Sequence, residues 1–125
     1  MKAQIGIYLS IALGIFGAIN CGSNGNSSAN NPPGTIIITI PASAISLGPA
    51  AYGTNPFHVP VGSNVAWTNA DSTAHTATSD TGVFDTSGIG PGSTSAAVAF
   101  NTAGNFPYHC SIHGAAHMSG TIVVP

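Results

Sequence analysis

Charged side chains are nearly absent from this sequence. Its 125 residues include one Lys or Arg and three Asp or Glu, and the single cation, Lys2, stands next to the N-terminus. Proteins that bind nucleic acid or anionic lipid headgroups need several cationic side chains to neutralise phosphates. The composition therefore excludes a nucleic-acid-binding function. Disorder is not expected either, because 43% of the residues are apolar and the net charge is small.

Long helical patterns are also missing. The chain holds 16 glycines and 9 prolines, and after the N-terminal segment apolar residues never keep helical spacing for more than a turn or two. Short runs with strand-like alternation occur instead, and they predict an all-β, Greek-key β-sandwich of about seven to eight strands. The predicted strands are residues 35–40, 57–61, 65–68, 74–78, 95–100, 105–110 and 120–124.

The N-terminal segment has the layout of an export signal. Lys2 precedes an apolar run over residues 5–19, which is too short for a comfortable membrane span and suits the hydrophobic region of a signal peptide. Cys21 follows, and then a polar tether. This arrangement resembles a bacterial lipoprotein signal, which implies that Cys21 is lipidated; ordinary cleavage nearby is the alternative.

We therefore expect three parts in the chain: an export signal over residues 1–21, a flexible linker over residues 22–34, and one folded domain over residues 35–125. The expected location is the periplasm or the outer face of a bacterial membrane. Membrane attachment is expected only through a lipid anchor at Cys21.

Cys110 is a lone thiol in an exported domain, where thiols normally pair. Cys21, the only other cysteine, is beside the membrane or removed. Alternation over residues 105–110 places Phe106, Tyr108 and Cys110 on one interior face. A bound metal would explain why this buried thiol persists.

Potential metal ligands are concentrated near this thiol. Cys110, His113 and Met118 lie within nine residues, and His75 lies upstream. One thiolate, two imidazoles and a weak thioether form a trigonal set with a long axial ligand, which suits copper in both oxidation states. We predict one copper ion with these four residues as its ligands.

Other readings of the same segment are weaker. Zinc held by Cys110, His113 and His117 would leave His75 and Met118 unexplained. Nucleophilic catalysis by Cys110 is disfavoured, because the thiol is predicted to be buried and no acidic residue in the loop could orient a histidine base. His117 is the rival for the axial position. The histidines that we expect on the surface are His58, His109 and His117.

The motifs around these ligands resemble one known family. They comprise residues 67–69 before His75, then Cys110, two residues, His113, four residues and Met118, and finally residues 120–123. Together they resemble the cupredoxins, or type 1 blue copper proteins, of the plastocyanin, pseudoazurin and amicyanin group. The resemblance covers nearly the whole predicted domain. It implies that His75, Cys110 and His113 are equatorial ligands and that Met118 is the axial one.

The resemblance also implies a function. Cupredoxins of this group are monomeric electron carriers without catalytic activity, and the edge of His113 would reach an apolar surface patch where redox partner proteins dock. A copper buffer or chaperone is the alternative. Backbone N–H groups of Thr76 and Ile112 are both expected to reach the sulfur of Cys110, since Ile112 replaces a proline that is common at its position.

Overall fold

The computed structural model describes residues 29–125, so the export signal and Cys21 lie outside the described residues. Seven strands and one short 3-10 helix make up the described chain. They are β1 (Ile36–Ile40), η1 (Ala44–Ser46), β2 (Phe57–His58), β3 (Ser63–Asn69), β4 (Thr78–Ser79), β5 (Val98–Phe100), β6 (Gly104–His109) and β7 (Ser119–Val124). The prediction of an all-β sandwich is confirmed.

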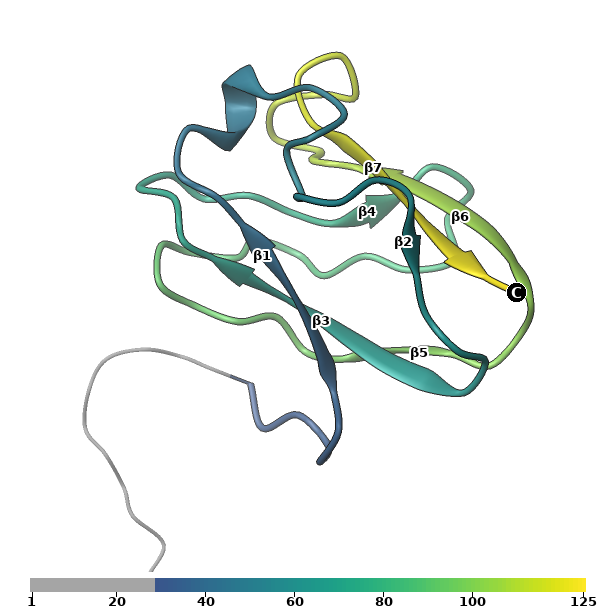
Figure 1. The fold of residues 1–125 in the computed structure, drawn as a ribbon. Coiled ribbons are helices and arrows are strands. Elements are labelled where there is room, and N and C mark those ends of the chain that lie inside the picture. Colours follow the sequence, from purple (N-terminus) through teal and green to yellow (C-terminus); the bar gives the residue numbers. More distant parts are fainter. Residues whose placement is uncertain (1–28) are drawn as a thin grey trace, which may run out of the picture.

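The strands form two sheets that face each other (Figure 1). One sheet has the order β1-β3-β5, with β1 parallel and β5 antiparallel to β3. The other has the order β2-β7-β6-β4, with β2 parallel to β7 and the remaining pairs antiparallel. The parallel pairs join strands that are distant in sequence, so the chain crosses between the sheets.

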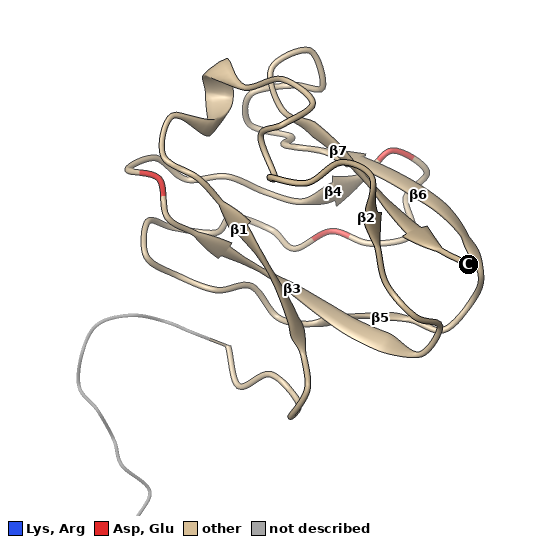
Figure 2. Cartoon of the chain, viewed as in Figure 1, with Lys and Arg blue, Asp and Glu red and all other residues tan. Residues whose placement is uncertain are grey.

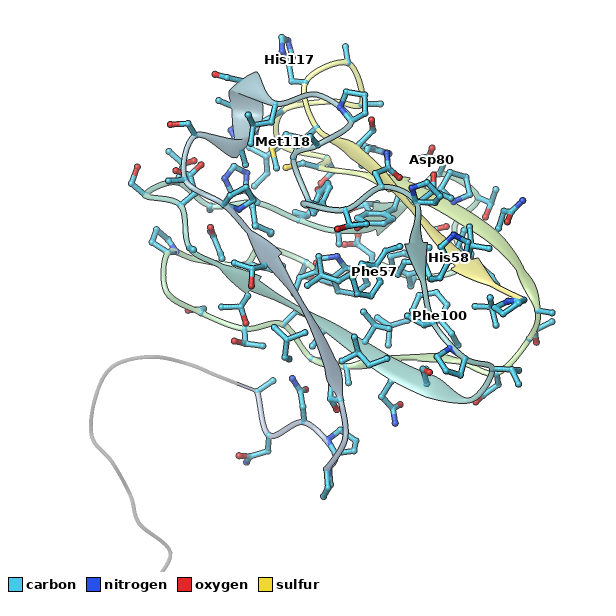
Figure 3. The ribbon with its side chains drawn as sticks, in the orientation of Figure 1. Phe57, His58, Asp80, Phe100, His117 and Met118 are labelled. Atoms are coloured by element: carbon cyan, nitrogen blue, oxygen red, sulfur yellow. The ribbon has the colours of Figure 1, made fainter. Side chains whose placement is uncertain are left out.

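The core lies between the sheets and follows the two-residue period of the strands. In β7 the residues Gly120, Ile122 and Val124 are buried, while their neighbours along the strand are partly exposed. Trp67 of β3 is fully buried, and Figure 3 shows Phe57 and Phe100 in the space between the two sheets. This packing gives one continuous core beneath the loops that follow β6.

The strand predicted over residues 74–78 is mostly wrong, because only Thr78 and Ser79 form β4. His75 makes an isolated bridge with Ile89, and the next two N–H groups leave the sheet pattern. The N–H of Thr76 donates to the sulfur of Cys110, and the N–H of Ala77 donates to a threonine hydroxyl. Sulfur and hydroxyl acceptors thus replace the carbonyls that a strand would use.

The two-residue alternation along the predicted strands 57–61 and 95–100 places Val61 and Ala96 in the interior, but both residues are exposed. Val61 was predicted to face inward but is 58% exposed, because β2 already ends at His58 and Pro60 opens the turn into β3. Ala96 is exposed because β5 begins only at Val98.

The described end of the predicted linker touches the sandwich. The N–H of Ala29 donates to the carbonyl of Thr94 at 3.4 Å, and the side-chain amide of Asn31 donates to the carbonyl of Ser95 at 3.0 Å. Within residues 29–125, no helix has the length and apolar character needed to cross a bilayer.

Candidate metal centre

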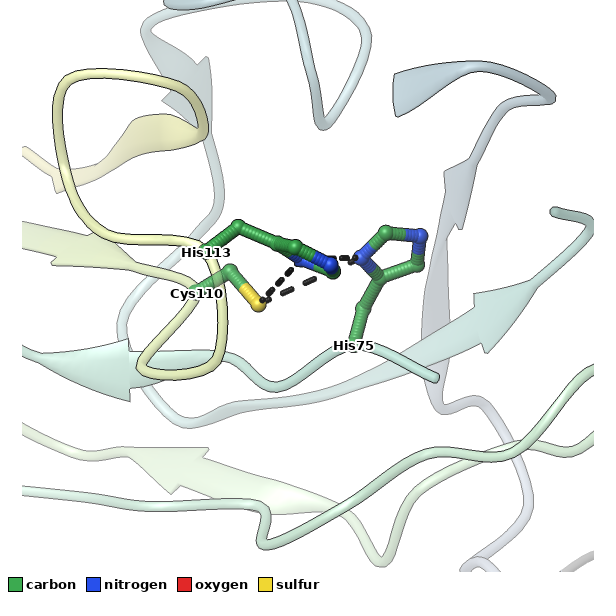
Figure 4. A group of neighbouring side chains, drawn as sticks. All are labelled: His75, Cys110 and His113. Carbon is green, nitrogen blue, oxygen red and sulfur yellow. Dashed lines mark hydrogen bonds between the residues drawn. The ribbon is translucent and has the colours of Figure 1, made fainter. Parts of the chain in front are cut away.

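Three predicted ligands converge at one end of the sandwich (Figure 4). The Nδ1 atoms of His75 and His113 are 3.2 Å apart. The sulfur of Cys110 lies 3.9 Å from the first and 3.4 Å from the second. His75 and Cys110 are completely buried, whereas His113 is partly exposed. One soft sulfur and two imidazole nitrogens therefore form a small triangle with a single partly open corner.

The size of this triangle fits a metal ion at its centre. Bonds of about 2.0 Å to imidazole and about 2.3 Å to thiolate, as in zinc sites, would separate trigonal donors by roughly 3.5 Å between nitrogens and roughly 3.7 Å between sulfur and nitrogen. The two sulfur–nitrogen separations, 3.4 and 3.9 Å, bracket the second value, and the nitrogen–nitrogen separation of 3.2 Å is slightly shorter than the first. The donor set and its spacing thus suit a copper ion after small shifts of the three side chains.

A closed loop positions two of these ligands. Cys110 directly follows β6, and its carbonyl accepts the N–H of Gly114 at 2.8 Å. The N–H of Met118 bonds the carbonyl of Gly114 at 3.1 Å, and the N–H of Cys110 bonds the carbonyl of Met118 at 3.2 Å. These bonds fold residues 110–118 into a compact turn that presents His113 beside Cys110.

Met118 and His117 point in different directions (Figure 3). Met118 is completely buried at the site end of the sandwich, and its backbone bridges to Gly48. His117 is exposed and projects outward. The thioether, rather than the third imidazole of this segment, is therefore the side chain available to the buried site.

Comparisons with known proteins agree with this geometry. The family model described as copper binding proteins of the plastocyanin/azurin family matches residues 42–125. The chain belongs to this family. Copper is accordingly the cofactor of this cupredoxin, and the resemblance inferred from the sequence is confirmed. The comparison with curated proteins finds no match.

Solved structures show the same fold. A purple cupredoxin from Nitrosopumilus maritimus is 28% identical with a TM-score of 0.62, covering 72% of this chain and 99% of that one. The Cu(I) form of an amicyanin point mutant is 26% identical with a TM-score of 0.60, covering 75% and 85%. The oxidised form of another amicyanin point mutant is 26% identical with the same score and coverage.

The thiol of this cupredoxin receives one N–H donor within the described chain, from Thr76 at 3.4 Å. The hydroxyl of Thr76 accepts the N–H of Ser111 at 2.8 Å, which fixes the loop directly after Cys110. The second donor that we expected, the N–H of Ile112, makes no such bond in this part of the chain. That expectation is wrong, because the residues after Cys110 are held by Thr76 and by their own turn.

Asp71 supports the other buried ligand and was not identified from the sequence. Its Oδ2 lies 2.9 Å from Nε2 of His75, the nitrogen that faces away from Cys110. This hydrogen bond to His75, aided by the N–H groups of Ser72 and Ser43, lowers the pKa of Asp71 to about 2. A carboxylate therefore lies one imidazole away from the proposed metal.

Two tyrosines fill the space beneath the site. The hydroxyl of Tyr52 donates to the carbonyl of Thr76, and the indole N–H of Trp67 donates to the hydroxyl of Tyr108 at 3.3 Å. Burial raises the pKa of both phenols, and the negative charge of Cys110 raises that of Tyr52 further. Both phenols stay neutral and pack against each other in the buried core next to the site.

The remaining histidines lie away from the triangle. His58 is exposed, as expected. His109 is only partly exposed and pairs with Asp80, so it is less solvated than the sequence predicted.

Proposed function

We propose that this cupredoxin carries single electrons between redox partner proteins, with one copper ion held by His75, Cys110, His113 and Met118, and that it catalyses no reaction itself. The convergence of two imidazole nitrogens and one thiolate in a buried triangle supports this function most directly. Copper bound there would supply one-electron chemistry by alternating between Cu(II) and Cu(I).

The chain contributes a rigid and dry environment. Cys110 is held by hydrogen bonds from both sides of its loop, and His75 is held by Asp71, so neither donor needs to move when the charge of the site changes. Small movement keeps the reorganisation during electron transfer small. Complete burial of His75, Cys110 and Met118 restricts access to the site to the corner at His113, which favours a carrier over an enzyme.

Electrons would enter and leave through His113. It is the one partly exposed member of the triangle and directly follows the exposed Ile112, and its loop lies at the same end of the sandwich as the segment after η1, where Leu47 is exposed. We call these three residues the apolar face. The described chain has no Lys or Arg, so a partner would recognise this face by apolar contact and shape rather than by charge.

Storage or delivery of copper is the second function considered from the sequence. Delivery proteins benefit from exposed, exchangeable ligands, whereas three of the four proposed ligands are completely buried here. The burial therefore favours electron transfer. Export and a lipid anchor at Cys21 complete the proposal, with a monomer working at the outer face of a bacterial membrane or in the periplasm.

Copper titration of the mature protein tests this function. We expect one Cu(II) per chain and an intense visible band from charge transfer out of the Cys110 thiolate. Cys110→Ser should remove the band even if imidazoles still bind copper, whereas the control His58→Ala, in an exposed histidine, should keep both the band and the stoichiometry. A colourless copper form of the wild-type protein would contradict the proposal.

A further inference from the structure

The carboxylate of Asp71 is surrounded by donors. Oδ1 accepts the N–H of Ser43 at 3.1 Å and the N–H of Ser72 at 2.8 Å. Oδ2 accepts the hydroxyl of Thr73 at 3.4 Å and lies 2.9 Å from Nε2 of His75. The carboxylate donates no hydrogen bond in return, which is the pattern of an ionised acid.

This negative charge has no cationic side chain to balance it. The side chain of Asp71 is only 8% exposed, and residues 29–125 contain no Lys or Arg (Figure 2). Buried charges in proteins are normally paired or associated with a metal. The positive charge closest to Asp71 in the working protein would be the copper ion on the far side of His75.

The hydrogen bond also fixes the state of the ligand. Nδ1 of His75 faces Cys110 and His113 (Figure 4), while Nε2, on the other side of the ring, lies 2.9 Å from Asp71. An ionised carboxylate can only accept, so Nε2 carries the ring proton and Nδ1 keeps its lone pair for the metal. A carboxylate behind a ligating imidazole makes that imidazole a stronger donor.

We propose that Asp71 is a positioning residue that stabilises the oxidised site and so lowers its reduction potential. This inference rests on the proposed function. One thiolate and two neutral imidazoles give a site with one net positive charge when oxidised and none when reduced. Adding Asp71 makes the oxidised site neutral and the reduced site negative, so gaining one electron becomes less favourable.

Asp71 also ties His75 to the loop before η1. Ser43 has a left-handed backbone conformation, with a φ of 61°. Its N–H donates a hydrogen bond to the same carboxylate that bonds the imidazole of His75. The ligand that comes from outside the 110–118 loop is thus anchored to a third segment of the chain. This anchor would resist movement of His75 between the two oxidation states.

Voltammetry on two charge-matched variants of the copper-loaded protein tests the inference. Asp71→Asn removes the charge and places an amide donor against the Nε2–H group. Asp85→Asn removes the same charge at an exposed carboxylate that bonds only Thr78 and Ser87. We expect Asp71→Asn to shift the equilibrium toward Cu(I) at least tenfold, which is about 59 mV for one electron, and Asp85→Asn less than about twofold.

Equal shifts in the two variants, or no shift in Asp71→Asn, would overturn the role of Asp71. Asp71→Glu, which keeps the charge, should recover most of the wild-type potential. If the wild-type copper protein lacks the intense thiolate band, the proposed function fails instead, so the two failures are distinguishable.

Infrared difference spectra between the oxidised and reduced wild-type protein provide a second test, which does not require the Asp71→Asn variant to fold. The chain has only three acidic side chains, so its carboxylate bands are few. We expect a carboxylate band to shift between the oxidised and reduced proteins and to persist in Asp80→Asn and Asp85→Asn. The inference would be overturned if the difference spectrum between the oxidised and reduced proteins showed no carboxylate signal. It would also be overturned if that signal disappeared in Asp80→Asn or in Asp85→Asn.

Discussion

The backbone N–H of Thr76 points at the sulfur of Cys110 across 3.4 Å, while the hydroxyl of the same residue holds the N–H of Ser111. One residue from the segment after His75 therefore fixes both the thiolate and the peptide that follows it. Because Thr76 is also adjacent to His75, it couples two ligand segments that lie far apart in the sequence.

Thr76→Val tests this coupling. The variant keeps the N–H to the sulfur but removes the hydroxyl that accepts the N–H of Ser111, and losing such a partly buried hydrogen bond costs about 0.5–1.5 kcal/mol. We expect the free energy of unfolding of the copper-free protein to fall by about that amount in urea titrations. Thr121→Val is the control, because its hydroxyl makes no hydrogen bond within residues 29–125, and it should change stability by less than about 0.5 kcal/mol. Equal losses in both variants would contradict the coupling.

The axial position can be assigned by a second pair of variants. Met118→Leu replaces the buried thioether by an aliphatic group of similar size, so we expect a site that remains coloured but has a higher reduction potential. His117→Ala removes an exposed side chain and should leave the spectrum and the potential nearly unchanged. Optical spectra and voltammetry of both variants decide the assignment, and the reverse pattern would give the axial role to His117.

The sequence predicted the members of the metal triangle because their chemistry and spacing are local features. Alternation along β6 places Phe106, Tyr108 and Cys110 on one side of the strand, and Tyr108 and Cys110 are indeed buried while Phe106 packs partly against the core. The short spacing from Cys110 to His113 also limits how far apart their side chains can lie. Only the position of His75 depended on the pairing of distant segments.

Asp71 was missed because its role depends on the shape of one turn. The side chain of Asn69 accepts the N–H of Asp71 at 2.9 Å and donates to the carbonyl of Thr73 at 2.7 Å, which curls the chain so that Asp71 meets His75. Asparagine is a known turn residue because its side chain bonds the backbone two residues on, but this signal does not reveal which side chain the residue at that position will face. The strand predicted around His75 was wrong for a similar reason, because the hydrogen bonds that hold this segment come from side chains that the alternation pattern does not reveal.

The apolar face is testable without a known partner, through electron self-exchange between oxidised and reduced copies. Ile112→Asp places a like charge at the contact on both copies, so we expect self-exchange to slow at least about tenfold. Val83→Asp is the control and adds the same charge at a valine that is 60% exposed, compared with 54% for Ile112. Val83 lies beside the residues that precede β6. This control should have little effect. NMR line broadening in mixtures of the two oxidation states measures the rate.

The wild-type rate should also depend weakly on salt, varying by less than about threefold between low and physiological ionic strength, because the face carries no charged side chain. A steep salt dependence, or equal slowing by Ile112→Asp and Val83→Asp, would place the contact elsewhere on the surface.

The packing beneath the site gives the last prediction. Gly120 of β7 lies opposite Tyr108 of β6, and a Cβ at this position would come within 2.8 Å of the tyrosine ring. Tyr108 cannot easily retreat, because it is buried, packs against Tyr52 with 4.7 Å between ring centroids and accepts the indole N–H of Trp67. Gly120→Ala should therefore lower the free energy of unfolding by about 1–3 kcal/mol, as overpacked cores do.

Gly88→Ala is the matched control, since a Cβ there meets no atom within 4 Å and its φ is not in the left-handed region. It should be neutral or slightly stabilising, by up to about 1 kcal/mol, because alanine restricts the unfolded chain. Urea unfolding of the copper-free variants measures both effects, and the thiolate band of the copper forms reports whether displaced Tyr108 disturbs Cys110 two residues along the chain. A Gly120→Ala variant as stable as Gly88→Ala would show that Tyr108 can move aside, so that this ring does not fix the floor of the copper site.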